Sequence, residues 1–168
     1  GVYDEKKMYS SWKVKIGHQP LSVDIQALRS TLLNIDRDTG MIRADANRGF
    51  NQSSFAKFAK AVKTMENVSI DLKLEYIEEP LEKQIEEDGL WSLEKQVAAL
   101  ERSFNENFIP YALDESVYDL LEIHHNDFSA VAANLLGVFG ESSRGCAAII
   151  LKPSLLGLET VSYTHLTL

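Results

Sequence analysis

Short apolar runs alternate along the chain with longer amphipathic stretches. Residues 11–17 alternate apolar and polar side chains and end at a glycine, a pattern that is typical of a β-strand. A run that is apolar throughout, at residues 147–151, predicts a strand that is buried on both faces. Three further short runs predict strands at residues 41–44, 72–77 and 109–113.

The stretches between these runs repeat their apolar residues at helical spacing. In residues 23–33, 51–65 and 128–138 the apolar side chains fall on one face of a helix. Residues 82–104 are also rich in helical signal, although an acidic run at residues 86–88 interrupts them. Strands that alternate with helices are typical of parallel βαβ units, so the pattern predicts an α/β fold.

Each predicted strand ends at a charged residue, and these residues recur every 30 to 38 positions, about one strand and one helix apart. In a (β/α)8 barrel the carboxyl ends of all strands meet at one mouth, where the chemistry is carried out. The alternation alone also fits an open doubly wound sheet, but its successive strand ends would not converge on one point. Convergence favours a partial (β/α)8 TIM-type barrel. Its strand-end residues are Lys15, Asp45, Glu78, Asp114 and Lys152.

Three of the strand-end residues, Asp45, Glu78 and Asp114, are carboxylates. Three carboxylates at one barrel mouth repel each other strongly unless a cation lies between them. A hard divalent cation prefers oxygen ligands, and Mg²⁺ keeps positions open for water and substrate, so we expect a Mg²⁺ site. Each carboxylate taken alone also fits a helix N-cap after a strand, where Asp is common.

Lys15 and Lys152 flank the three carboxylates at the two ends of the series. A lysine that is partly desolvated, or near other cations, has a lowered pKa and can serve as a general base. A base, a divalent metal and a second cation together suit the removal of a proton next to a carboxylate. The enediolate formed in that reaction carries negative charge that a metal stabilises. The sequence therefore predicts an enzyme with this chemistry.

Composition narrows the class of protein. The chain has 168 residues, of which 45% are hydrophobic and 25% are charged, as in an ordinary globular domain. Its formal net charge of −8 disfavours general binding to nucleic acid or to an anionic membrane, since both would repel it. Its one cysteine, Cys146, excludes an internal disulfide and favours a reducing compartment, the cytoplasm.

Five short motifs resemble those of the enolase superfamily, in its muconate-lactonizing enzyme branch. Within that branch, residues 150–155 and 45–50 most resemble the o-succinylbenzoate synthases. The motifs follow the family's order at barrel spacing, over residues 11–158. They are K-x-K at residues 13–15, D-A-N at 45–47, E-E-P at 78–80, D-E-S at 114–116 and the sixth-strand lysine at Lys152.

The resemblance implies a role for each motif. Lys15 would be the general base that removes the α-proton, and once protonated it would assist the departure of the β-hydroxyl group. Lys152 would stabilise the enediolate from the opposite face, and Lys13 would help to depress the pKa of Lys15. The first acid of each of the other three motifs would bind Mg²⁺. The implied reaction is the Mg²⁺-dependent syn dehydration of a small cyclohexadiene carboxylate to o-succinylbenzoate in menaquinone biosynthesis.

Sister enzymes of the same branch are the main alternatives: a dipeptide epimerase, an N-acylamino acid racemase or a muconate cycloisomerase. The sixth strand of a dipeptide epimerase or a muconate cycloisomerase usually lacks Pro and Ser after the lysine, so Pro153 and Ser154 favour an o-succinylbenzoate synthase over these two. The alternative from another class is an inactive truncated fragment, which holds the site residues but does not assemble them.

The extent of the resemblance predicts the domain organisation. We expect residues 1–160 to form a partial barrel of about strands two to six, without the N-terminal capping domain and the last strands of the family. Residues 161–168 resemble a translated sequencing adapter, and a genuine C-terminal strand is the alternative. A partial barrel leaves strand edges open, so we expect the isolated chain to aggregate or to stay partly unfolded.

Overall fold

The computed structural model divides the chain into two compact units, Gly1–Glu82 and Lys83–Leu168. Among the helices of the described part of the chain, none combines the length and the apolar character needed to cross a membrane. The structure describes residues 11–35, 40–65, 73–140 and 144–152, and the backbone of residues 164–167.

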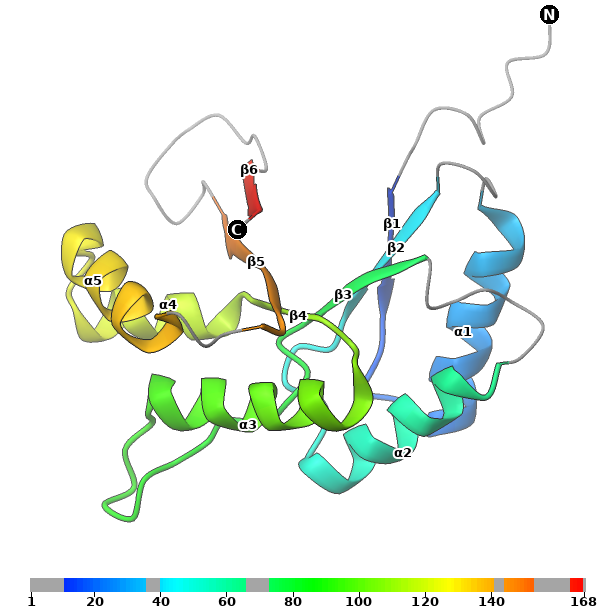
Figure 1. Cartoon of the computed structure of the whole chain (residues 1–168), viewed down its shortest axis with the longest axis horizontal. Helices are drawn as coiled ribbons and strands as arrows, with labels where there is room; N and C mark the ends of the chain where they lie inside the picture. Colours follow the sequence, from blue (N-terminus) through cyan, green and yellow to red (C-terminus); the bar gives the residue numbers. More distant parts are fainter. Residues whose placement is uncertain (1–10, 36–39, 66–72, 141–143, 153–163, 168) are drawn as a thin grey trace, which may run out of the picture. The chain divides into compact units, whose positions relative to one another are not determined.

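The described part of the first unit alternates three parallel strands with two helices (Figure 1). Strand β1 (Ser11–Lys15) pairs with β2 (Met41–Asp45), and β2 pairs with β3 (Leu74–Glu78), so the strands lie in sequence order. Helix α1 (Leu21–Asn34) follows β1, and helix α2 (Gln52–Lys63) follows β2. Right-handed crossovers between successive parallel strands place both helices on the same side of the strands.

The core of the first unit forms between these helices and one face of the strands. Ile42 and Ile77 of the strands are fully buried, as is Phe58 of α2. The ring of Phe58 lies 5.1 Å from that of Phe50, between ring centroids, so aromatic packing closes the end of the unit near β2. Helix α2 begins with a reciprocal cap at Asn51, which stabilises the turn that follows β2.

Within its described residues, the second unit contains three helices and three strands (Figure 1). Strands β4 and β5 are parallel, and β6 pairs antiparallel with β5. In chain order the elements are α3 (Leu93–Asn107), β4 (Tyr111–Leu113), α4 (Glu115–Ile123), α5 (Phe128–Phe139), β5 (Cys146–Leu151) and β6 (Thr164–Thr167).

A carboxylate on α3 fixes the start of β5. Glu101 accepts hydrogen bonds from the hydroxyl of Tyr111, at 2.8 Å, and from the backbone N–H groups of Arg144 and Gly145, at 3.2 and 3.0 Å. A Cβ atom on Gly145 would lie 2.5 Å from the ring of Phe104, so this position requires glycine. The chain therefore enters β5 along a path set by α3.

The α/β class and the five predicted strands are confirmed, but the helical prediction for residues 82–92 needs correction. Residues 82–92 are not helical: they form a loop with an isolated bridge between Ile85 and Trp91, and α3 begins at Leu93 behind the cap of Ser92. Helix α4 was not predicted. The backbone of residues 164–167 forms β6, and residues 153–163 lie outside the described residues, so the adapter-like origin of residues 161–168 stays a prediction.

Candidate active site

The three strands of the first unit end level with one another and carry the predicted charged residues. Lys15 is in register with Asp45, and Asp45 is in register with Glu78. Because side chains alternate along a strand, these residues and Lys13 point away from the face that carries Ile77 and the helices. Asp45 and Glu78 are 4% and 1% exposed, so two adjacent carboxylates are buried at this edge.

Lys13 joins the two buried carboxylates. Its Nζ atom donates a hydrogen bond of 2.6 Å to Oε2 of Glu78 and lies 3.0 Å from Oδ2 of Asp45. The side chain of Lys13 is itself 44% exposed, so the ammonium group enters the pair from the solvent side. One cation thus neutralises part of the charge of two carboxylates that would otherwise repel each other.

Lys15 lies nearer to solvent, beside a tight turn. Its Nζ atom donates a hydrogen bond of 2.9 Å to Oδ1 of Asn47 and lies 3.5 Å from Oδ2 of Asp45. Asn47 and Arg48 both have positive φ angles, and the N–H of Gly49 closes the turn on the carbonyl of the residue before them at 2.8 Å. Two central residues of positive φ are typical of type I′ turns, which Asn favours. Asn47 is therefore a turn residue that also holds the predicted base.

The loops after β1 and β2 are in close backbone contact. A Cβ atom on Gly49 would lie 2.6 Å from the carbonyl carbon and oxygen of Gly17, and Gly17 has a φ of +90°. The N–H of Gly17 also donates a hydrogen bond of 2.9 Å to Oδ2 of Asp24, a carboxylate that is 2% exposed in the first turn of α1. This contact fixes the spacing of the strand ends that carry Lys15 and Asp45.

A second buried ion pair holds the loops after β2 and β3. The Nε atom of Arg48 lies 3.6 Å from Oε1 of Glu79, whose side chain has no exposed surface. Glu79 adopts a φ of +36°, which is unfavourable for a residue with a Cβ atom. Backbone strain of this kind is concentrated at functional sites, and here it directly follows Glu78.

The second unit presents a similar pair at the ends of its parallel strands. Nζ of Lys152 lies 2.6 Å from Oδ2 of Asp114, which is fully buried at the N-cap position of α4. The same ammonium group lies 5.1 Å from the centroid of the Tyr118 ring, a cation–π contact. Both charged residues stand one position beyond their strands. The second unit thus repeats the arrangement of a buried carboxylate paired with a half-exposed lysine.

The ion pairs raise the pKa values of two lysines. Burial alone would lower the pKa of Lys13, but the hydrogen bonds and charges of Glu78 and Asp45 outweigh it, so its pKa lies above the ordinary value. Burial likewise acts to lower the pKa of Lys152, and its hydrogen bond to Asp114 raises the pKa overall. A raised pKa favours the charged form of both lysines.

The first unit brings together two of the three predicted metal ligands. Oδ1 of Asp45 is buried and makes no hydrogen bond within the described residues. Adjacent buried carboxylate oxygens match the ligand preference of Mg²⁺, so Asp45 and Glu78 fit such a site. Asp114 belongs to the second unit, and among the described residues no three His, Cys, Asp or Glu side chains gather as a metal-binding group. The three-carboxylate site stays a prediction.

The N-cap alternative is wrong for Asp45 and Glu78, which are the last residues of their strands. Asp114 does occupy an N-cap position, but its side chain makes no capping hydrogen bond. Sequence reasoning missed the supporting contacts of Asp24 and Arg48. The D-A-N-R-G sequence carries a signal for the turn, whereas the partners of these two residues depend on how the loops pack.

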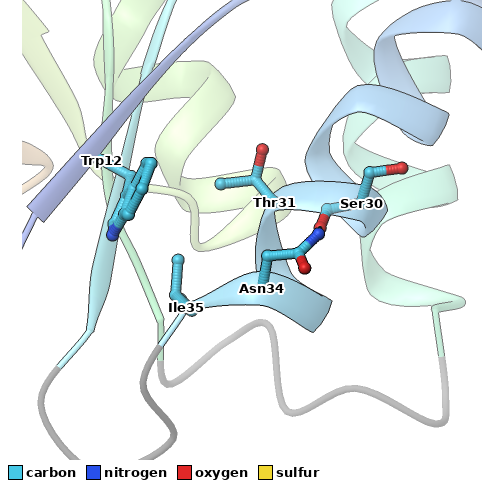
Figure 2. Close-up of a pocket in the computed structure, with 5 residues that line it drawn as sticks. All are labelled: Trp12, Ser30, Thr31, Asn34 and Ile35. Atoms are coloured by element: carbon cyan, nitrogen blue, oxygen red, sulfur yellow. The ribbon is translucent and has the colours of Figure 1, made fainter. Parts of the chain in front are cut away.

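A cavity lies on the other face of β1. It has a volume of about 220 Å³ and lies between the side chain of Trp12 and the last turn of α1, as Figure 2 shows. Trp12 and Lys13 are neighbours in the strand and point to opposite faces. The cavity is therefore separate from the charged strand ends. Its other lining residues are Ser30, Thr31, Asn34 and Ile35.

Comparison with protein families and solved structures identifies the fold. The family described as Enolase C-terminal domain-like matches residues 3–129. The structure is similar to the o-succinylbenzoate synthase of Thermosynechococcus elongatus BP-1, solved with Mg in its active site, at 19% identity and a TM-score of 0.52. It is also similar to a muconate lactonizing enzyme from Klebsiella pneumoniae, at 19% identity and a TM-score of 0.50. No curated protein matches the chain.

These similarities cover most of this chain but less than half of each solved structure. The match spans 79% of this chain and 42% of the Thermosynechococcus protein, and 76% of this chain and 36% of the Klebsiella protein. At such identities the likeness concerns the fold. It confirms the expected partial (β/α)8 barrel.

Proposed function

Because the chain belongs to the Enolase C-terminal domain-like family, we propose that it is part of a Mg²⁺-dependent o-succinylbenzoate synthase. One observation carries the proposal: Lys15 stands in register with Asp45, and Asp45 with Glu78, on one face of three parallel strands. A base beside a pair of buried carboxylates is the arrangement that proton abstraction next to a substrate carboxylate requires. The substrate would be a small cyclohexadiene carboxylate, and the enzyme would act in the cytoplasm.

In the proposed chemistry one lysine transfers protons and the other two supply positive charge. The neutral amine of Lys15 removes the α-proton, and its ammonium form then gives a proton to the departing β-hydroxyl group, which leaves as water. Lys13 and Lys152 stay protonated and stabilise negative charge on the substrate. Asp45, Glu78 and Asp114 would hold Mg²⁺, which when bound would stabilise the charge of the enediolate.

The base assignment agrees with the contacts of Lys15. Its Nζ atom is held by Asn47 and by Asp45 at 3.5 Å, and its side chain is 76% exposed. A lysine held by a neutral amide beside one carboxylate, and open to a ligand above the strand ends, can meet a substrate directly. Lys13 is held between two carboxylates, which favours a role as a cation.

Turnover with and without Mg²⁺ tests the proposal. The protein is assayed with the cyclohexadiene carboxylate, with Mg²⁺ or with a chelator, beside Lys15→Ala and Asp45→Asn. We expect dehydration that needs Mg²⁺ and falls about a hundredfold or more in Lys15→Ala, the usual contribution of a general base. Undiminished turnover in Lys15→Ala would overturn the assignment.

The alternatives give a different result in the same assay. A sister enzyme would leave the cyclohexadiene carboxylate unchanged and would instead exchange the α-proton of a dipeptide or an N-acylamino acid. Pro153 and Ser154, which favour the synthase, lie outside the described residues. An inactive fragment would act on none of these substrates, although it would still contain Lys15 and the carboxylates.

A further inference from the structure

The ammonium group of Lys13 lies at the point where two buried carboxylates converge. Nζ is 2.6 Å from Oε2 of Glu78 and 3.0 Å from Oδ2 of Asp45. Both carboxylate side chains are 5% exposed or less. Lys15, on the same face, is 3.5 Å from Asp45 and donates its hydrogen bond to Asn47 instead. The two lysines of the motif are therefore in different electrostatic positions.

A divalent cation bound by the same oxygens would meet Lys13. A divalent cation and the ammonium group of Lys13 would compete for Oδ2 of Asp45 and Oε2 of Glu78, because their charges repel at that distance. The side chain of Lys13 is 44% exposed, and lysine is a point charge on a flexible four-carbon stem. It can leave the carboxylates without a change in the backbone, while Asp45 and Glu78 are fixed by their strands.

We propose that Lys13 is the built-in counter-cation of the metal-free site, and that it leaves Asp45 and Glu78 when a divalent cation binds. The inference rests on the metal site of the proposed function. Lys13 keeps the two carboxylates together in the metal-free protein. It also lowers the affinity for Mg²⁺, because its ion pairs must break before the metal contacts the same oxygens.

Calorimetric titration of the full chain with Mg²⁺ tests the affinity. Lys13→Met keeps the apolar stem and removes the charge, and Lys15→Met is the matched control, with the same change two residues away. We expect Lys13→Met to bind Mg²⁺ at least about fivefold more tightly than the wild type, the lower range of coupling between two competing ligands. We expect a smaller gain in Lys15→Met and loss of binding in Asp45→Asn.

A measurement on the wild-type chain avoids the risk that Lys13→Met does not fold. An amine-reactive reagent is added with and without Mg²⁺, and mass spectrometry follows the labelling of Lys13 relative to Lys15. Ion pairs to two carboxylates protect Lys13 in the metal-free protein. When the metal releases Lys13 from the carboxylates, the labelling of Lys13 relative to Lys15 is expected to rise about fivefold, in line with the affinity change.

The outcomes separate this inference from the proposed function. If Mg²⁺ binds through Asp45 but Lys13→Met binds no more tightly than Lys15→Met, and labelling of Lys13 stays constant, the counter-cation role is overturned and the metal site stands. If neither the wild type nor Lys13→Met binds Mg²⁺, both the inference and the metal site are overturned.

Discussion

Replacement of Gly49 by alanine tests whether the loops after β1 and β2 need their close backbone contact. The added Cβ atom would lie 2.6 Å from the carbonyl carbon and oxygen of Gly17 and 2.8 Å from its Cα atom, all of them backbone atoms. Ordinary contacts of a Cβ atom begin at 3.4 Å, so the loops would have to separate by most of an ångström. Overpacking of this kind costs about 1–3 kcal/mol.

Urea unfolding of the full chain measures this cost. The control is Gly137→Ala, because a Cβ atom at that position in α5 meets nothing within 4 Å. Alanine there should raise the free energy of unfolding by about 0.5–1 kcal/mol, the usual gain over glycine inside a helix. We expect Gly49→Ala to lower the unfolding midpoint and Gly137→Ala to raise it. An unchanged midpoint in Gly49→Ala would refute the close contact that spaces the strand ends.

Two further substitutions test the buried polar groups of the first unit. The hydroxyl of Tyr76 is buried with no hydrogen bond in the described part of the chain, so Tyr76→Phe should leave stability unchanged or raise it by about 1 kcal/mol. Burial raises the pKa of Tyr76 to about 12 from 10.0, so the folded protein keeps a proton that the unfolded chain loses. The free energy of unfolding should therefore fall as the pH rises from 10 to 12, and it should fall less in Tyr76→Phe. Denaturant titrations that give the same dependence on pH for both proteins would contradict this. Arg48→Met removes a cation from the buried Glu79 and should cost about 3 kcal/mol, whereas Lys83→Met, at a pair whose lysine side chain is 46% exposed, should cost less than about 1 kcal/mol. Similar losses in urea unfolding would speak against a supporting role for Arg48.

The strands of the fold could be predicted because the order of apolar and polar residues along the chain indicates which segments are buried. The apolar run at residues 147–151 and the alternation at residues 11–17 both became strands near the expected bounds. The expected burial of the 147–151 strand on both faces is wrong, because only Ala148 and Ile150, on one face, are buried. Residues 82–92 misled the prediction, because charged and apolar side chains at helical spacing also fit a loop that folds back on itself. Instead of forming a helix, the backbone pairs Ile85 with Trp91 in a bridge, and this pairing overrides the local helical signal.

The position of the charged residues at the strand ends could be predicted, but their pairing could not. Alternation alone places Lys13 and Lys15 on one face of β1. Which of them lies between the carboxylates depends on the reach of each side chain and on the turn that offers Asn47 to Lys15. The buried pair of Arg48 and Glu79 depends on the positive φ angles of Asn47, Arg48 and Glu79. The packing of the loops imposes these angles, so the sequence alone does not reveal the pair.

Exchange of the substrate α-proton with solvent tests the central claim most directly, because it follows the proposed action of Lys15 whichever sister reaction comes next. The protein is incubated in D2O with the cyclohexadiene carboxylate or an N-acylamino acid, and NMR follows the α-proton signal. We predict that the signal disappears only when Mg²⁺ is present, and that it persists in Lys15→Ala. Loss of the signal without Mg²⁺, or at an equal rate in Lys15→Ala, would contradict the account.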